Sequence, residues 1–354
     1  MSDNVVYWLG AGFSAPLGIP VVRNFLSKAK DQFASDNSKH DDFSTIFELI
    51  EGLAKAKNYY KSNQFDIEEI FSILDMQSQL EGADSKVKFA KFIGEVVDHY
   101  TPTIQPYSNR LPGNWDEFIW GGGEYDQNRK TISLYGYFHA CIHNLRIVQK
   151  TSHSESDSTR FEFQKRRDGA ARYDIITVNY DAVLDSFTRF FAEYYGADHI
   201  ESSSEEEAPD ALMSPRIARL HGSVTVGTVV PPTWSKGLSE SILSEWQRGF
   251  EMLRNANQLR IIGYSLPETD AYIRYLLKAA SLKTFNLKKI DIICLDPDGS
   301  VQDRYASFID FDGYRFANRS VEDYLRCNMD LIKKPLSDRL DCSTLEFAHS
   351  KFFS

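Results

Sequence analysis

Two apolar runs of this 354-residue chain end in polar residues that can activate a water or a hydroxyl. Val178 is followed by Asn179-Tyr180-Asp181, and Leu220 is followed by His221-Gly222. A neutral amide such as Asn179 can orient a water or a hydroxyl, and an imidazole such as His221 can accept its proton near neutral pH. These residue types predict acid–base chemistry on an uncharged oxygen.

A glycine-rich turn at the start of the chain predicts a phosphate site. The apolar run 5–9 leads into Gly10-Ala11-Gly12-Phe13-Ser14-Ala15, which has the spacing G-x-G-x-x-A. Gly10 permits a tight turn, and Gly12 lets the backbone approach a pyrophosphate. The amides of Ala11 and Gly12, with the hydroxyl of Ser14, suit phosphate oxygens.

Two common classes of protein that contain such a turn are disfavoured. A dehydrogenase needs an acidic residue at the end of a second strand about 20 residues on, whereas Asp31 lies in a polar helical stretch with no strand before it. No Gly-Lys-Ser/Thr follows the turn, so it is not a P-loop. By itself the spacing is also compatible with an ordinary structural turn.

Further apolar runs, several followed by helical periodicity, predict the elements that position these residues. Strand and helix in alternation predict an α/β fold, a Rossmann-like open parallel sheet covered on both faces. The expected strands are 5–9, 173–178, 216–220, 258–263 and 290–295, and the expected helices between them are 182–195, 269–280 and 301–308.

The long stretch between the first two strands predicts a large, mostly helical insertion at about 36–165. Its clearest helix start is Phe65-Asp66-Ile67-Glu68-Glu69-Ile70, with Asp66 and Glu69 as a capping box. Polar loops are expected at 150–170 and 201–210. The domain is expected to span 1–312, with a short C-terminal extension at 313–354.

The expected sheet brings the reactive residues together. Ligands of open α/β sheets bind beyond the carboxyl ends of the strands. Ser14 on the first loop should therefore converge with the residues that follow four other strands, which are Asn179, His221, the segment 263–265 with Gly263 and Ser265, and Asp296.

Composition narrows the class of protein. No apolar run approaches the roughly 18 residues that span a bilayer. The first strand begins at once, which predicts no secretory signal. Four scattered cysteines without a CxxC pair predict neither zinc knuckle nor disulfide framework and fit a cytoplasmic protein. The net charge of −10 disfavours direct nucleic-acid binding.

One pair of histidines has metal-ligand spacing. His139 and His143 lie four residues apart, on one face of an expected helix. The glutamate of His-Glu-x-x-His is missing, no third ligand is near in sequence, and Tyr137 and Phe138 are typical of a packed helix. We expect no metal here.

The first turn and four later stretches together resemble the sirtuin family. Gly10-Ala11-Gly12-Phe13-Ser14, with Gly18-Ile19-Pro20 and Arg23, resembles its NAD-binding turn. The four later stretches follow in the family's order over roughly residues 5–310. They are Val178-Asn179-Tyr180-Asp181, Leu220-His221-Gly222-Ser223, Ile262-Gly263-Tyr264-Ser265-Leu266 and Leu295-Asp296-Pro297-Asp298.

Two departures indicate which branch the chain resembles. Protein-deacylating sirtuins carry a four-cysteine zinc module after the His-Gly motif, but residues 221–258 contain no cysteine. The family's Asp-Phe-Arg is replaced by Val21-Val22-Arg23. The resemblance is therefore to the zinc-free bacterial branch, whose members hydrolyse NAD in antiphage defence and need no metal.

The resemblance implies roles for individual residues. Asn179 and His221 would be catalytic, with Asp181 in the nicotinamide pocket. The remaining residues would bind NAD, the substrate: Gly10, Ala11, Gly12, Ser14, Arg23, Gly263, Ser265 and Asp296. Plainer interpretations stay open, with Asp181 as a helix N-cap and Asp296-Pro297 as a turn.

The resemblance also implies a biological setting. NAD depletion would halt an infected cell by abortive infection, so activity must be gated by homo-oligomerisation or by a partner such as a HerA-type ATPase or a short Argonaute. Two other functions remain open. They are an NAD-dependent protein deacylase and a non-catalytic subunit that binds NAD or ADP-ribose.

Overall fold

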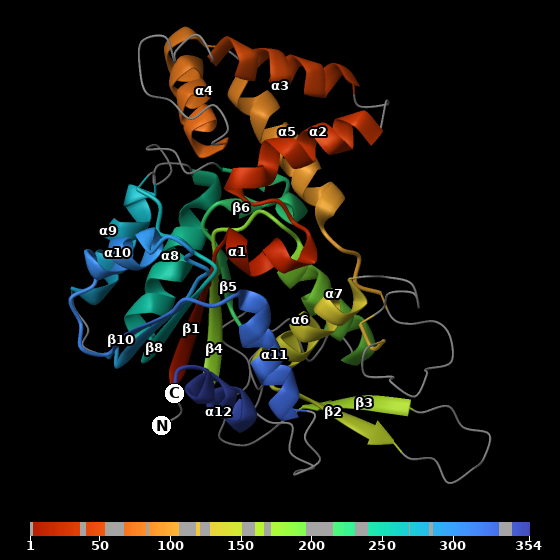
Figure 1. Cartoon of the computed structure of the whole chain (residues 1–354), viewed down its shortest axis with the longest axis vertical. Coiled ribbons are helices and arrows are strands. Elements are labelled where there is room, and N and C mark those ends of the chain that lie inside the picture. Colours follow the sequence, from red (N-terminus) through yellow and green to blue (C-terminus); the bar gives the residue numbers. More distant parts are fainter. Residues whose placement is uncertain are drawn as a thin grey trace.

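A six-stranded parallel sheet forms the centre of the molecule (Figure 1), in the order β10-β9-β8-β1-β4-β5. The computed structural model describes residues 3–35, 40–53, 67–82, 85–105, 118–120, 128–150, 160–165, 171–195, 215–230, 240–268, 270–282, 286–332 and 342–354. The expected α/β fold is confirmed. The strands are β1 (Asn4–Leu9), β4 (Arg172–Thr177), β5 (Ile217–Arg219), β8 (Gln258–Ile262), β9 (Lys289–Ile293) and β10 (Tyr314–Ala317).

The strand order determines where a ligand binds. Counted along the chain, the six strands run 3-2-1-4-5-6 across the sheet, which is the doubly wound order. The order reverses between β1 and β8, which pair directly in parallel. In sheets of this type the usual ligand site lies at this point, outside the carboxyl ends of the strands.

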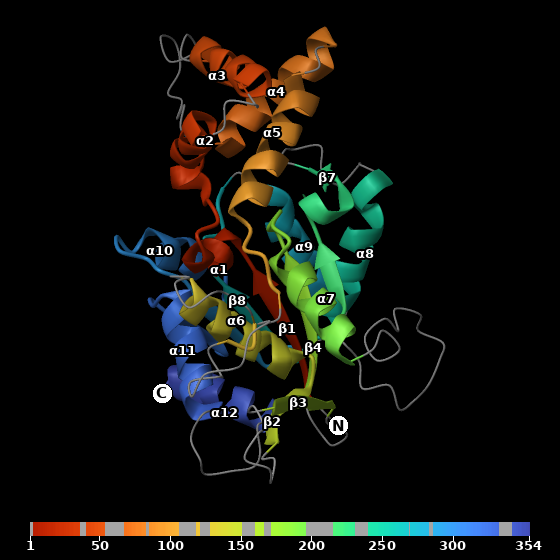
Figure 2. The same cartoon turned by 90° about the vertical axis from the view of Figure 1, so that its right-hand side faces the viewer.

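Helices cover both faces of the sheet, as Figures 1 and 2 show. Side chains alternate along β1, so that Tyr7 and Leu9 face one layer while Val6 and Trp8 face the other. The first layer contains α6 (Arg129–Ile142), α7 (Val183–Tyr195), α11 (Val321–Ile332) and α12 (Cys342–Phe352). The second contains α8 (Glu240–Asn255), α9 (Ala271–Ser281) and α10 (Ser300–Ala306).

A helical lobe stands over the carboxyl ends of the strands (Figures 1 and 2). It has its own core, in which Phe43 and Phe89 pack against Phe92. The capping residues Phe65 and Asp66 lie outside the described residues. The lobe consists of α2 (Phe25–Ser35), α3 (His40–Leu53), α4 (Ile67–Glu81) and α5 (Ser85–Tyr100).

Two expectations about the insertion and the C-terminus need correction. The insertion ends in an antiparallel hairpin, β2 (Leu145–Lys150) with β3 (Arg160–Lys165), so part of the expected loop 150–170 is a strand. The segment 313–354 supplies strand β10 and two covering helices, so the sheet extends beyond residue 312. Short β10 was missed because its four residues alternate apolar and polar too briefly to stand out. The second expected loop, 201–210, lies outside the described residues.

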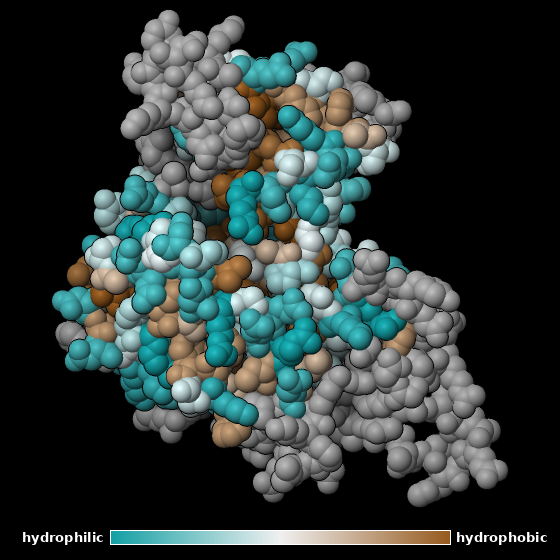
Figure 3. Space-filling view, viewed as in Figure 1, coloured by the Kyte–Doolittle hydropathy of each residue, from teal (hydrophilic) through white to brown (hydrophobic). Residues whose placement is uncertain are grey.

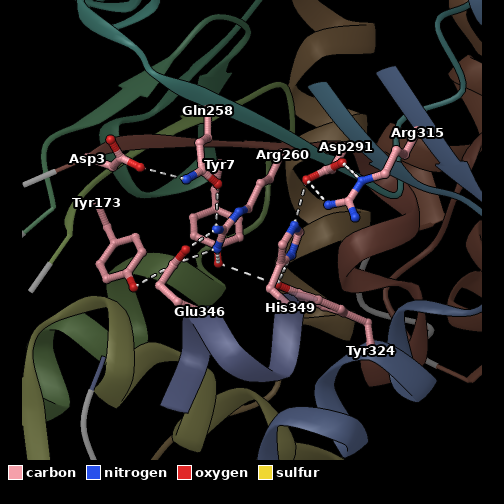
Figure 4. A network of polar contacts seen from close by, with 10 residues as sticks. All are labelled: Asp3, Tyr7, Tyr173, Gln258, Arg260, Asp291, Arg315, Tyr324, Glu346 and His349. Carbon is pink, nitrogen blue, oxygen red and sulfur yellow. Dashed lines mark hydrogen bonds and ion pairs between the residues drawn. The ribbon is translucent and has the colours of Figure 1, made fainter. Parts of the chain in front are cut away.

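Helix α12 is attached to the sheet by polar side chains rather than by apolar packing alone (Figure 4). Tyr7, Arg260, Asp291 and Arg315 stand beside one another on four neighbouring strands. From α12, Glu346 forms an ion pair with Arg260, and His349 Nε2 lies 2.9 Å from Asp291 Oδ2.

Within the described residues, no helix is both long and apolar enough to cross a membrane.

Candidate functional site

The turns after β1 and β8 pack backbone against backbone at the point where the strand order reverses. Gly263 has φ +65°, and a Cβ there would lie 2.2 Å from Phe13 N. A Cβ on Gly10 would lie 2.6 Å from the Gly263 carbonyl oxygen. Larger residues would force these turns apart, so the glycines are required for the contact itself.

That contact corrects one expectation about phosphate binding. The Gly12 amide donates to the Gly263 carbonyl oxygen at 2.8 Å, so it is engaged within the protein. Ala11 is exposed and lines the cavity beside this contact, in the four-residue helix α1 (Ala11–Ser14). Of the two amides assigned to phosphate, only that of Ala11 retains this interpretation.

A cavity of about 580 Å³ opens beside these turns, within the size range of small-molecule sites. Its floor is polar, with Asn179, Asp181 and His221 from the loops after β4 and β5. Its roof is apolar and comes from the helical lobe; Figure 3 shows this hydrophobic surface where the lobe meets the sheet. The roof residues include Phe25, Ile67, Phe71, Ile93 and Val97.

Asn179 is buried in the floor and only partly satisfied. Its Nδ2 donates to Ser14 Oγ at 3.2 Å, and its backbone amide donates to Thr177 Oγ1 at 3.0 Å. Its Oδ1 accepts no hydrogen bond from any of the residues that the structure describes. A buried amide oxygen with unused capacity at a cavity is ready to accept a hydroxyl or a water.

Asp181 is placed for both of the roles considered for it, which are the helix cap and a contact in the ligand pocket. Its Oδ1 accepts from the amide of Val183, the first residue of α7, at 3.1 Å, so it caps that helix. Burial raises the pKa of its carboxyl, although a hydrogen bond from Ser14 opposes the change. The same residue lines the cavity, so the cap orients it there.

His221 is buried after β5, where the chain enters the short ladder of β6 (Gly222–Ser223) and β7 (Thr228–Val229). The 3₁₀ turn between these strands, η7, spans Val224–Val226. Its ring is tilted against that of Tyr180, with centroids 5.9 Å apart. Its Nε2 lies 3.6 Å from Asp270 Oδ1, an ion-pair distance. The imidazole is therefore held between an aromatic ring and a carboxylate at the cavity wall.

Sequence reasoning missed Asp270. It was interpreted as part of the start of the helix 269–280. The available signal was an aspartate in the loop that follows Gly263-Tyr264-Ser265, which the resemblance had already singled out. Nothing in the sequence shows that its side chain faces His221, because 48 residues separate the two positions.

Three predicted binding residues do not line the cavity. Gly10 is buried against Gly263 and Tyr264. Ser14 is buried beneath Asn179, where it supports that side chain instead of meeting a phosphate. Asp296 is buried, and its two carboxylate oxygens accept from the amides of Val301 and Gln302 at 3.1 and 2.8 Å. Asp296 thus caps α10, and its contact with a ribose stays a prediction.

The remaining predicted residues do border the cavity. Arg23 is exposed in the turn η2 (Val22–Asn24), which follows the turn η1 (Ala15–Leu17). Ser265 also lines the cavity, together with Gly263. Ser320 and Val321, at the start of α11, complete the wall from a segment that sequence reasoning placed outside the domain.

The histidine pair on α6 is a core feature. His139 is fully buried and stacks on Phe187 with ring centroids 4.5 Å apart. Burial lowers the pKa of His143 to about 3, so it is neutral. Among the described residues, no group of three or more His, Cys, Asp or Glu side chains could hold a metal ion.

Comparisons with known proteins give only distant likenesses. No protein-family model matches the chain, and no curated protein matches it. A solved structure of Sir2 with a p53 peptide and NAD+ is similar over 93% of each chain, at 12% identity and a TM-score of 0.38. A structure of Sir2 bound to an acetylated peptide gives 93%, 12% and 0.37. Likeness this distant says nothing of activity, which is argued below from the site.

Proposed function

We propose that the protein hydrolyses the bond between nicotinamide and ribose in NAD, releasing nicotinamide and ADP-ribose. The observation that carries this proposal is the convergence of Asn179 and His221, from two separate strand ends, on one cavity beside the paired glycine turns. The sirtuin-like motifs in the sequence agree with this assignment, since the resemblance implies that NAD is the substrate.

The chemistry suits these residues. The nicotinamide leaving group is already cationic, so its departure needs no general acid. The reaction needs stabilisation of an oxocarbenium-like centre and a positioned water, as in other glycoside cleavages. Asn179 Oδ1 can accept from the water or a ribose hydroxyl, and His221 can remove its proton.

The rest of the cavity supports binding of the other parts of NAD. Arg23 supplies positive charge for the phosphates, and the Ala11 amide and Ser265 add donors. The apolar roof excludes water from the reacting bond, which strengthens the electrostatic interactions beneath it.

The test is direct measurement of nicotinamide release. Purified protein is incubated with NAD, alone and with candidate partners, and nicotinamide is followed by chromatography. Release by the wild type that is lost in Asn179→Ala and in His221→Ala is the expected result. Release that persists in both variants would contradict the assignment of this site.

One observation favours a second candidate, an NAD-dependent protein deacylase. The roof of the cavity includes the apolar side chains of Phe71, Ile93 and Val97, and an apolar surface of this kind could hold an acyl chain. Nicotinamide release that depends on an added acyl-peptide would support this candidate, whereas release from NAD alone supports the hydrolase.

For the hydrolase we also propose a role in antiphage defence through NAD depletion. Because uncontrolled loss of NAD kills the host, activity would be gated by self-assembly or by a partner such as a HerA-type ATPase or a short Argonaute. If the protein alone releases no nicotinamide from NAD but releases it after such a partner is added, the result would support gating. If no nicotinamide is released with any partner although the protein binds NAD measurably, a non-catalytic binding subunit would be favoured.

A further inference from the structure

Asp270 occupies a helix N-cap position without acting as a cap. It precedes Ala271, the first residue of α9, and aspartate there normally accepts from an amide of the first turn. Its side chain makes no such hydrogen bond, and the residue is 2% exposed. A buried carboxylate turned away from its own helix must be stabilised elsewhere, because burying it without partners is costly.

The carboxylate is turned toward the cavity instead. Asp270 Oδ2 accepts from Tyr264 Oη at 2.8 Å, and Oδ1 lies 3.6 Å from His221 Nε2. Tyr264 belongs to the turn whose backbone packs on the first glycine turn, so it holds the carboxylate at a fixed place. The three side chains are all buried, and each residue lines the cavity.

We propose that Asp270 is the positioning residue of His221. This inference rests on the proposed hydrolysis of NAD and names a further member of its machinery. The carboxylate of Asp270, 3.6 Å from Nε2, favours the neutral imidazole that carries its proton on Nε2, so that Nδ1 is the basic nitrogen. The charge of this carboxylate also stabilises the imidazolium that forms during the reaction.

The step balances as follows. A water loses a proton to Nδ1 of His221 while its oxygen forms a bond to the anomeric carbon of the ribose. The bond between that carbon and the nicotinamide nitrogen breaks, and its electron pair neutralises the pyridinium. The imidazolium then returns its proton to solvent. Asp270 is not itself a reactant in this step.

The kinetic test uses Asp270→Asn, which keeps the shape and an acceptor for Tyr264 but removes the charge. We expect kcat to fall about 10²- to 10⁴-fold, by analogy with carboxylates that orient a catalytic histidine, with KM for NAD changed less than about threefold. Glu268→Gln is the matched control, because Glu268 is an exposed carboxylate on the same loop. An unchanged kcat in Asp270→Asn would overturn the inference while the proposed function stands.

A second measurement does not depend on turnover. The ¹⁵N chemical shifts of the His221 ring, assigned by their loss in His221→Gln, report which nitrogen carries the proton. We expect Nε2–H in the wild type and a shift toward Nδ1–H in Asp270→Asn. If the wild type cleaves no NAD, the proposed function fails, and this measurement alone decides the pairing. The same tautomer in both proteins would overturn it.

Discussion

Two buried polar regions of this molecule differ in where their unsatisfied atoms lie relative to the cavity. Beneath α12, Arg260 forms an ion pair with Glu346 and donates to Tyr7 Oη at 2.7 Å, and Asp291 accepts from His349 and Arg315 (Figure 4). At the carboxyl ends of the strands, by contrast, Asn179 Oδ1 lies at the cavity and has no hydrogen-bond partner among the described residues.

The difference separates a structural network from a site. Beneath α12 the charged groups pair with one another and fix a helix on the sheet, and the Nε of Arg260, which is unpaired among the described residues, belongs to a residue that does not line the cavity. Groups with unused capacity beside a cavity cost stability unless a ligand completes them, which is typical of functional sites. We therefore expect substitutions in the first region to change stability and those in the second to change activity.

The largest expected effect is on catalysis. Asn179→Ala and His221→Ala should each lower kcat for nicotinamide release about 10²- to 10⁴-fold, the range for loss of a general base or its partner. Their free energies of unfolding, measured in urea, should change by about 1 kcal/mol. Arg326→Met, on the exposed outer side of α11, is the control for activity. Losses of several kcal/mol in the two site variants would erase the distinction between the regions.

The next largest effect is on stability. Arg260→Met leaves Glu346 without its buried partner, so we expect a loss of about 3 kcal/mol, the lower part of the range for a broken buried pair. Arg326→Met is again the matched control, since its pair with Glu322 is exposed and should contribute less than about 1 kcal/mol. Equal losses in the two variants would show that burial does not decide the energetics here.

The network also predicts a dependence of stability on pH. Burial and the nearby Arg260 cation lower the pKa of His349 to about 4, although Asp291 opposes them. A histidine whose pKa is depressed in the folded state stabilises the protein above its unfolded pKa of about 6.5, and this stabilisation is lost as the pH falls toward 4. The wild type should therefore lose about 2 kcal/mol more than His349→Gln between pH 7.5 and pH 5.

Comparison with the variant isolates this residue. His139 and His143 also have lowered pKa values, but they are present in both proteins and their contributions cancel. Below pH 4 the free energy of unfolding should fall further, because Asp291 begins to bind a proton in the unfolded state. Burial would raise the pKa of Asp291, but hydrogen bonds from His349 and Arg315 lower it to about 2. If the free energy of unfolding changed equally in the two proteins from pH 7.5 to pH 5, the role of His349 would be contradicted.

The smallest expected effect concerns Asp296, which the sequence predicts to bind the ligand and which caps α10 in the structure. Asp296→Ala removes the cap of α10 and should cost about 1 kcal/mol, with KM for NAD changed less than about threefold. Asp298→Ala, which removes an exposed hydrogen bond in the same turn, should cost less. A tenfold or larger rise in KM for Asp296→Ala would restore it as a ligand residue.

Much of the architecture was predictable because local patterns decide it. The buried strands read as continuous apolar runs, and β-branched residues fill them, so β1, β4, β8 and β9 were all expected close to their observed bounds. The edge strand β10 was not, since its four residues carry little periodicity. The hairpin of β2 and β3 was not either, because its strands mix apolar residues with charged and polar ones.

At the site, the sequence determined which residue types follow each strand, and parallel strands made Asn179 and His221 converge. Only the tertiary structure decided how each side chain is used. Asp181 caps a helix and lines the cavity, Asp296 caps a helix beneath it, and Asp270 turns from its helix toward His221. The reason is physical. An aspartate before a helix can accept from its own backbone or from a distant partner, and the choice depends on which donors the fold brings within about 3 Å.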